Sequence, residues 1–278
     1  MDKKEKQKIA REILEDIYLN GYIETIYNTP NMFHRREGWV MKNGLWSPWY
    51  FNVRPVGSTP KIVAKIGYAM NNMLRDEIPD LTQIVAVEMC GVPLASVVST
   101  AYGEGTEFIP YAYTRPLPGP KVRNPEEAQK ILSEFKGDVH GYGSKRLVEG
   151  RFKDNDVLCI IDDVVTSFGS KLIAKLITEY EVERQGMKGV SIDHVAVVMD
   201  REQGAEGEAK KHGMQLHALI RFKSEGLSWI KDIMYPKDYE IITDYLEDSS
   251  KYQDPDFRKK ILDEAVEEEV NISNGIHR

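Results

Sequence analysis

The sequence predicts an α/β fold: a single domain with a mostly parallel central sheet flanked by helices, plus a small N-terminal hood. The chain has 278 residues, of which 41% are hydrophobic and 29% charged, the composition of an ordinary globular protein. Short apolar segments alternate with amphipathic segments through its middle. Such alternation is typical of parallel strand-helix-strand units, whose sheet is covered on both faces.

The hood is assigned to residues 1–55. Residues 4–27 carry apolar side chains at helical spacing, which predicts one or two short helices. Residues 38–54 are rich in aromatic and β-favouring side chains and contain the turn pair Asn43-Gly44. We therefore expect two strands joined by a tight turn in this segment.

The α/β core is assigned to residues 56–225. Expected strands lie at residues 84–87, 108–113, 157–161, 193–199 and 216–222. Expected helices lie at residues 60–75, 92–103, 170–183 and 206–213, and Ser58 or Thr59 is available to cap the first. In such sheets ligands bind at the carboxyl ends of the strands, so the loops after strands are where chemistry is expected.

Two further regions are distinguished. Residues 116–150 form one long connection between core strands, and connections of this length are usually lids, binding loops or disordered inserts. Within it, Asn124 and Pro125 suit the N-cap and first position of a helix, expected at residues 125–135. Residues 226–278 are acidic, and we expect a solvated helical region with a frayed end.

Composition and charge exclude several classes of function. A net charge of −7 gives no general attraction to nucleic acid or anionic lipid. No segment has the ~20 uninterrupted apolar residues of a membrane span, and the N-terminus lacks the apolar stretch of a secretory signal, so we expect a cytoplasmic protein. Cys90 and Cys159 stand alone, without a CxxC pair or a histidine cluster, and indicate neither a disulfide framework nor a zinc site.

The sharpest chemical signal is residues 157–170. An apolar strand ends in Asp162 and Asp163, and a turn that opens a helix follows, with candidate phosphate ligands Thr166, Ser167, Gly169 and Ser170. Hydroxyls, glycine N–H groups and a helix N-terminus suit a phosphate, and the carboxylates suit the vicinal hydroxyls of a ribose. The plainer interpretation is a solvated strand end followed by a helix cap. The complete order of residues favours a sugar phosphate site.

This segment resembles the 5-phosphoribosyl 1-pyrophosphate (PRPP) signature of the type I phosphoribosyltransferases. The resemblance implies that Asp162 and Asp163 contact the ribose 2′ and 3′ hydroxyls and that the turn holds the 5′-phosphate. Phe168 departs from the pattern, because a small residue is more usual there.

Further segments resemble one branch of this family, the orotate phosphoribosyltransferases. The hairpin at residues 40–51 is similar to theirs, which implies that Lys42 contacts the reactants and that Tyr50 and Phe51 pack against the pyrimidine. From the residues alone, an aromatic-rich hairpin is more often core. Arg201, in residues 199–204, resembles the arginine that pairs with the orotate carboxylate; the alternative is a surface salt bridge to Asp200 or Glu202.

The long connection carries the last resemblance. Arg115 ends a strand, as does the family's pyrophosphate arginine, and His140 resembles the histidine of its mobile catalytic loop. Lys136 lies four residues before His140, rather than two, and an insertion separates Arg115 from His140. Cys90 stands where some members have a lysine. The loop cations that remain candidates for the pyrophosphate are Lys121, Arg123, Lys136, Lys145 and Arg146.

The resemblance implies transfer of phosphoribosyl from PRPP to orotate, giving orotidine 5′-monophosphate and pyrophosphate. It implies Mg²⁺ bound mainly through PRPP and pyrophosphate, with no dedicated protein metal site, and a homodimer with shared active sites. Two alternatives stay open: a phosphoribosyltransferase for a different base, and a PRPP-binding regulator without turnover. A regulator of that kind would need a nucleic-acid-binding surface, and the sequence has no basic stripe.

Overall fold

The computed structural model describes residues 3–41, 44–119, 122, 124–135 and 146–273. The chain forms two compact units. The core unit comprises Met1–Ala10 and Gly57–Arg221, and the hood unit comprises Arg11–Val56 and Phe222–Arg278. The bounds expected from the sequence, residues 1–55, 56–225 and 226–278, stay predictions. The assignment of the whole chain to one domain stays a prediction.

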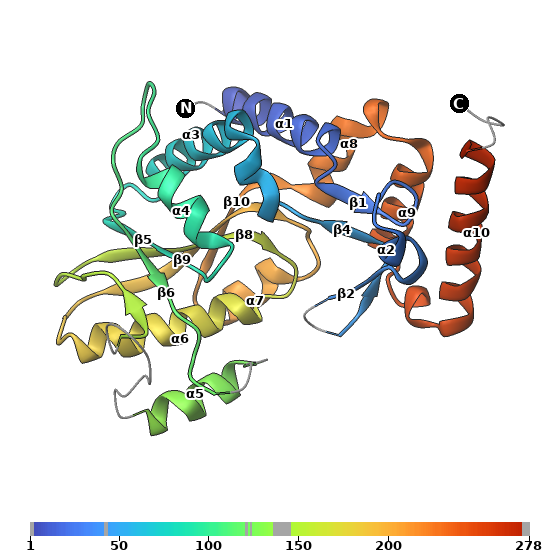
Figure 1. Ribbon diagram of the computed structural model, residues 1–278. Coiled ribbons are helices and arrows are strands. Elements are labelled where there is room, and N and C mark those ends of the chain that lie inside the picture. The colour runs from blue at the N-terminus through green and yellow to red at the C-terminus, as the bar shows by residue number, and fades with distance from the viewer. Residues whose placement is uncertain (1–2, 42–43, 120–121, 123, 136–145, 274–278) are drawn as a thin grey trace. The chain divides into compact units, whose positions relative to one another are not determined.

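The core unit contains the predicted parallel sheet, which confirms the fold class (Figure 1). Over the described residues its strand order is β10-β9-β8-β5-β6-β7, and β7 alone runs antiparallel to its neighbour. The strands are β5 (Gln83–Ala86), β6 (Tyr111–Thr114), β7 (Val148–Glu149), β8 (Val157–Val165), β9 (Ser191–Asp200) and β10 (Gln215–Arg221). The carboxyl ends of the parallel strands therefore meet at one edge of the sheet.

Helices cover both faces of this sheet (Figure 1). α3 (Pro60–Glu77) and α4 (Gly91–Ser99) lie on one face, and α6 (Gly169–Arg184) lies on the other, with α5 (Pro125–Glu134) packed against it. α7 (Ala205–Lys211) connects β9 to β10. The buried apolar cluster on the α6 side includes Val165, Phe168, Ala174, Ile177, Val195 and Val197. Helices on both faces explain why β8 is almost continuously apolar.

The hood unit is built from an N-terminal segment and a C-terminal segment of the chain. Its N-terminal part contains β1 (Ile23–Thr25), α2 (Met32–Glu37), β2 (Trp39–Val40), β3 (Trp46–Ser47), β4 (Trp49–Phe51) and the second half of α1 (Lys3–Leu19). Its C-terminal part contains α8 (Leu227–Ile230), α9 (Pro236–Glu247) and α10 (Pro255–Ser273). β2 pairs with β3 and β1 with β4, both antiparallel, so the hairpin expected in residues 38–54 is confirmed.

Polar contacts hold the two parts of the hood unit together. Asp238 on α9 is completely buried and accepts hydrogen bonds from Thr25 Oγ1 (2.5 Å), Asn28 Nδ2 (2.8 Å) and Tyr18 Oη (3.0 Å). The side chain of Gln253 bonds both the N–H and the carbonyl of Trp46. The C-terminal region is therefore packed against the hairpin rather than being a separate solvated segment.

Several elements differ from the expectations, among them β1, β8 and α4. Ile23–Thr25 is a strand, because it pairs with β4, and is not helical. β8 runs on past Ile161 to Val165, because its pairing with β9 continues to the end of that strand. α4 stops at Ser99 instead of reaching residue 103. Within the described residues, no helix is both long and apolar enough to span a bilayer.

Candidate active site

The acid pair lies inside β8, a few residues before α6. Asp162 is 4% exposed, and its Oδ2 lies 2.6 Å from Nζ of Lys171. Its Oδ1 accepts the backbone N–H of Asp163 (2.9 Å), and Asp163 Oδ1 accepts that of Val164 (2.7 Å). The plainer interpretation, a solvated strand end, is therefore wrong for Asp162.

Asp163 is partly exposed, unlike its neighbour. Burial raises the pKa of Asp163 to about 6, the charge of Asp162 adds to the rise, and the ammonium of Lys171 opposes it. The two carboxylates therefore differ in exposure, although the charge of Asp162 acts on Asp163. A role for Lys171 in the site was not expected from the sequence. The signal that would have pointed to it is its place in the first turn of α6, where the helix dipole disfavours a cation.

The turn between β8 and α6 presents polar groups at its surface. Ser167 is exposed, Thr166, Gly169 and Ser170 are partly exposed, and a Cβ added to Gly169 would meet no atom within 4 Å. Phe168 is 1% exposed and its ring belongs to the core cluster, so the phenyl group lies beneath the turn and does not fill it. Its side chain gives α6 no capping hydrogen bond. The first N–H groups of α6 are thus suited to an anion.

Arg201 follows β9 and lies next to the end of β8, because its backbone N–H donates to the carbonyl of Val165 (3.1 Å). It is 1% exposed, so its side chain is buried rather than lying at the surface. Asp200 is also buried, which raises its pKa, and its Oδ1 accepts the N–H of Glu202 (2.8 Å). The predicted base-binding arginine therefore follows the strand adjacent to the predicted phosphate turn.

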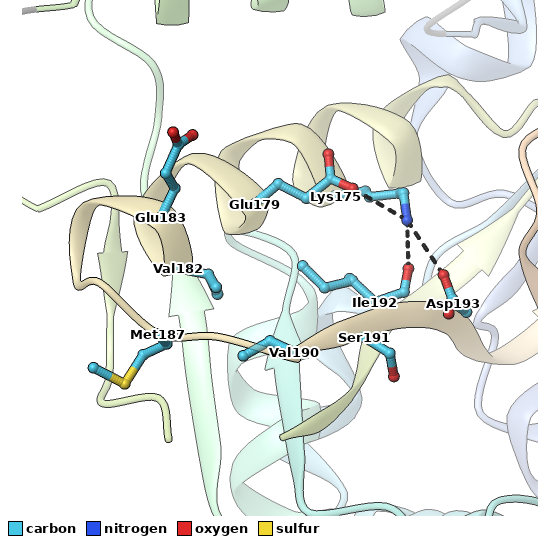
Figure 2. A pocket seen from close by; sticks show the side chains of 9 residues that line it. All are labelled: Lys175, Glu179, Val182, Glu183, Met187, Val190, Ser191, Ile192 and Asp193. Atoms are coloured by element: carbon cyan, nitrogen blue, oxygen red, sulfur yellow. Dashed lines mark hydrogen bonds and ion pairs between the residues drawn. The ribbon is translucent and has the colours of Figure 1, made fainter. Parts of the chain in front are cut away.

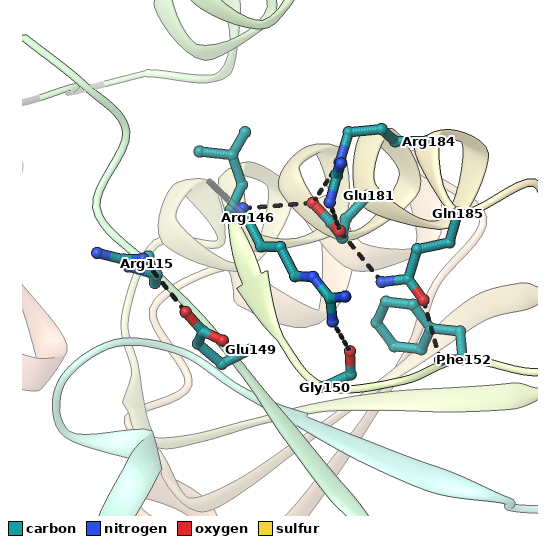
Figure 3. A network of polar contacts seen from close by, with 9 residues as sticks. Arg115, Arg146, Glu149, Gly150, Phe152, Glu181, Arg184 and Gln185 are labelled. Atoms are coloured by element: carbon teal, nitrogen blue, oxygen red, sulfur yellow. Dashed lines mark hydrogen bonds and ion pairs between the residues drawn. The ribbon is translucent and has the colours of Figure 1, made fainter. Parts of the chain in front are cut away.

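Arg115 follows β6, two strands from β8 on the same edge of the sheet. Its Nη1 lies 3.2 Å from Oε1 of Glu149 on β7, and the two side chains are 29% and 30% exposed. Figure 3 shows this pair beside a second network around Glu181. The arginine predicted to meet pyrophosphate thus has a carboxylate partner in the described structure.

The Glu181 network was missed by the sequence analysis. Glu181 on α6 is completely buried and accepts hydrogen bonds from Arg184, Gln185 and the N–H of Leu147 (Figure 3). The preceding residue, Tyr180, donates from its hydroxyl to the carbonyl of Phe135 (3.0 Å). Two consecutive residues of α6 therefore bind the chain just before and just after residues 136–145.

Several predicted site residues are not brought together by the described structure. Lys42, Lys136 and His140 lie outside the described residues, as do Lys121, Arg123 and Lys145. Tyr50 and Phe51 belong to β4 of the hood unit, where Tyr50 stacks on Trp39 with ring centroids 6.2 Å apart and Phe51 is buried. The roles of all these residues toward a base or pyrophosphate stay predictions.

The loop after β5 also reaches this edge of the sheet. A Cβ on Gly91 would lie 2.6 Å from the carbonyl oxygen of Ile161, so glycine is needed for α4 to start this close to β8. The N–H of Glu88 donates to Thr114 Oγ1 (3.2 Å), and Cys90 is partly exposed. β5, β6, β8 and β9 thus all end near the candidate site.

A surface hollow of about 340 Å³ lies elsewhere, between α6 and the start of β9 (Figure 2). Lys175 crosses it, donating to the carbonyl of Ile192 (2.8 Å) and pairing with Glu179 and Asp193. Because Ser191 and Ile192 begin β9, the hollow lies at the amino ends of the strands. It is therefore remote from the edge at which the predicted ligands gather.

Known proteins are similar to this chain in sequence and in fold. No protein-family model matches the chain. The orotate phosphoribosyltransferase of Methanocaldococcus jannaschii is 27% identical over 184 residues, which cover 66% of this chain and 84% of that protein.

Two solved structures share the fold. The orotate phosphoribosyltransferase of Francisella tularensis matches with a TM-score of 0.54 and 16% identity, over 85% of this chain and 98% of that one. The UMP synthase of Leishmania donovani matches with a TM-score of 0.60 and 17% identity, over 86% of this chain but only 42% of that one. The chain therefore has the type I phosphoribosyltransferase fold, and in sequence it is orotate phosphoribosyltransferase-like.

Proposed function

We propose that this protein is an orotate phosphoribosyltransferase, which transfers the 5-phosphoribosyl group of PRPP to orotate in the synthesis of UMP. The products are orotidine 5′-monophosphate and pyrophosphate. The observation that carries the proposal is the similarity to the Methanocaldococcus jannaschii orotate phosphoribosyltransferase over 84% of that protein's length. The geometry of the core unit supports it, because an acid pair, an open turn and a helix N-terminus follow one another at the ligand-binding edge of the sheet.

The 5′-phosphate is proposed to bind the turn at residues 166–170. Thr166, Ser167 and Ser170 supply hydroxyl donors, and the uncapped start of α6 supplies N–H groups and a positive dipole end. The ribose then lies toward the acid pair of β8, where a carboxylate accepts hydrogen bonds from its hydroxyls. This arrangement suits a sugar phosphate, since carboxylates beside the turn would repel a bare anion.

The base is proposed to be recognised through Arg201, whose planar guanidinium can hold the orotate carboxylate with two hydrogen bonds. The position of Arg201 beside the end of β8 supports this role. The roles of Lys42, Tyr50 and Phe51 toward the base rest on the motif resemblance alone.

Loss of pyrophosphate builds positive charge on the anomeric carbon and negative charge on the leaving oxygens, so positioning and electrostatics would carry most of the catalysis. Arg115, Lys136 and His140 are proposed to meet the pyrophosphate. The pair between Arg115 and Glu149 is partly exposed to water, and such pairs contribute only ~0–1 kcal/mol, so Arg115 can exchange its partner for a phosphate.

Mg²⁺ is proposed to arrive with PRPP and to neutralise the pyrophosphate charge. The described residues contain no group of three histidine, cysteine or acidic side chains able to hold a metal ion. We propose that the ion is coordinated mainly by the oxygens of the substrate, as is usual for Mg²⁺. A homodimer with shared active sites is proposed from the motif resemblance, and sedimentation of the purified protein would test it.

The direct test is an assay of orotate consumption and pyrophosphate release with PRPP and Mg²⁺, with adenine, hypoxanthine and uracil as comparison bases. We expect turnover with orotate and little with the other bases. Turnover with another base alone would reassign the substrate. Tight PRPP binding without turnover of any base would indicate a PRPP-binding regulator and contradict the proposal.

A further inference from the structure

Lys171 is the residue of the candidate site that the proposed function does not use. It is 3% exposed, and its ammonium reaches three acceptors: Asp162 Oδ2 (2.6 Å), the carbonyl of Val164 (2.7 Å) and Ser170 Oγ (3.3 Å). A lysine ammonium has three donors, so all of them are used. Lysine normally extends its charged end into water, and this one is held inside the site.

The position of Lys171 is unfavourable for helix formation. It is the third residue of α6, where the positive end of the helix dipole disfavours a cation. A buried charge also costs free energy unless it is paired and hydrogen-bonded. The compensation comes from the carboxylate of Asp162, which is buried to a similar degree. Each charge of the pair therefore depends on the other.

The ion pair between Lys171 and Asp162 leaves Asp162 and Asp163 with different hydrogen-bond partners. Asp162 has one oxygen on Lys171 and the other on the N–H of Asp163, so both of its oxygens are engaged. Asp163 is partly exposed and forms no ion pair within the described residues; its Oδ1 accepts the N–H of Val164. A ribose hydroxyl that approached Asp162 would compete with a buried ammonium, whereas Asp163 offers a carboxylate oxygen without that competition.

We propose that Lys171 is a positioning residue of the PRPP site: it holds Asp162 as a buried, neutralised carboxylate, so that Asp163 alone binds the ribose hydroxyls. This inference rests on the proposed function and assigns unequal roles to the two acids. With Lys171 in place, Asp162, Asp163 and Lys171 together carry one net negative charge toward a ligand that is itself an anion. Without Lys171 the pair carries two, and like charges this close disfavour ionisation of both.

The charges acting on Asp163 are Asp162 on its own strand and Lys171 on the packed helix. Because the pKa of Asp163 is raised to about 6, PRPP affinity should fall as pH decreases through about 6. Removal of Lys171 alone takes away the charge that opposes this rise, so the fall should move to higher pH. Removal of Lys171 and Asp162 together takes away one charge of each sign and should leave the pH profile close to that of the wild type.

The test is calorimetric titration of PRPP with Mg²⁺ into the wild type and into the variants Asp163→Asn, Lys171→Met and the double variant Asp162→Asn/Lys171→Met, from about pH 5.5 to 8.5. The double variant should keep PRPP affinity close to that of the wild type. Asp163→Asn should lose about 10- to 100-fold, the range for a hydrogen bond to a charged group. Titration of the ligand's own phosphates is common to all variants and cancels in the ratio of their Kd values.

Lys175→Met is the matched control, because Lys175 also forms ion pairs from α6 but lies at the opposite end of the sheet. It should leave PRPP binding unchanged. If Lys171→Met does not fold, the double variant decides, since it contains no unpaired buried charge. Equal losses of PRPP affinity in the double variant and in Asp163→Asn would overturn the inference. Wild-type protein that binds PRPP without using orotate would remove the proposed function and leave the inference standing.

Discussion

Phe168 shows how an unusual residue is accommodated in the turn that is proposed to bind the phosphate. Its ring lies in the core cluster under α6, while Ser167 and Gly169 on either side remain accessible. The ring therefore anchors the turn and leaves the space above Gly169 open. The sequence alone could not tell which way the ring points, because that depends on how α6 packs against the sheet.

Replacement of Arg201 tests the identity of the base. Arg201→Ala should raise the KM for orotate by about 10- to 100-fold, the value of a lost charge-assisted pair, with a much smaller change in the KM for PRPP. Initial-rate kinetics with each substrate varied in turn would measure both. Arg201→Lys should recover part of the loss, because it restores the charge but not the planar fork. An equal rise in both KM values would argue against a role at the base.

At the scale of elements, the sequence predicted what its local pattern specifies. The strands and helices of the core unit lie close to their expected ranges, because period-two and period-3.6 patterns are local signals. β1 was missed because it is only three residues long and its partner, β4, lies far along the chain. The buried pair of Lys171 with Asp162 was missed for a similar reason: it depends on the meeting of a strand and a helix.

The same limit applies to the candidate site. The residues of the turn at 166–170 could be predicted because they are consecutive, whereas the position of Arg201 beside the end of β8 depends on the pairing of β8 with β9, which the sequence did not specify. The engagement of Arg115 by Glu149 could not be predicted, since it requires β7 to return antiparallel beside β6.

Glu181 should be the main anchor of the long connection on α6. Glu181→Ala leaves the buried N–H of Leu147 without its acceptor and removes the partner of Arg184, so we expect a loss of about 2–4 kcal/mol in the free energy of unfolding. Chemical denaturation would measure it. Glu183→Ala on the exposed face of the same helix is the control and should change stability by less than about 0.5 kcal/mol. Similar values for the two variants would contradict the anchoring role.

At the scale of the whole molecule, the hood unit combines two segments that lie far apart in the sequence. Residues 222–278 complete the unit that residues 11–56 start, through contacts such as Gln253 with Trp46. The sequence predicts these regions as separate segments, because no local pattern records a contact between residues so far apart in the chain. The hood unit therefore depends on long-range contacts that form only after most of the chain is synthesised.

Asp238 should be the polar centre of the hood unit. Asp238→Ala leaves three hydrogen-bond donors without their acceptor, and at about 1 kcal/mol each the hood unit should lose roughly 3 kcal/mol. Hydrogen exchange of the amides of β1 and β4, followed by mass spectrometry, would show faster exchange there. Asp232→Ala, at an exposed position, should leave the exchange unchanged. Equal protection in both variants would mean that apolar packing alone holds this unit.

A histidine pair in the core unit should make stability depend on pH. His194 Nδ1 lies 3.1 Å from His217 Nε2, and His217 Nδ1 lies 2.7 Å from Glu77, which also pairs with Lys6. Burial lowers the pKa of His194 and the charge of His217 adds to this, whereas Asp193 and Asp80 oppose it.

Because the pKa of His194 is lowered in the folded chain, the unfolded chain binds a proton at His194 more tightly. Stability should therefore fall as pH decreases below about 6.5, the ordinary pKa of histidine. Asp163 has the opposite effect, since its raised pKa favours the protonated folded state as pH falls. The comparison of wild type with His194→Gln isolates the histidine: the variant should lose less stability between about pH 7.5 and 5. Parallel curves of unfolding free energy against pH would show that His194 does not contribute.

The two adjacent attachment points on α6 have a consequence for how this connection can change in evolution. Phe135 and Leu147 are fixed by Tyr180 and Glu181, so the ends of the intervening stretch stay at a set separation whatever its length. The entropy of closing such a loop grows only with the logarithm of its length, about 0.6 kcal/mol for each doubling. Natural variants can therefore gain or lose residues between Phe135 and Leu147 with little loss of stability. The start of α6, where the phosphate is proposed to bind, need not shift.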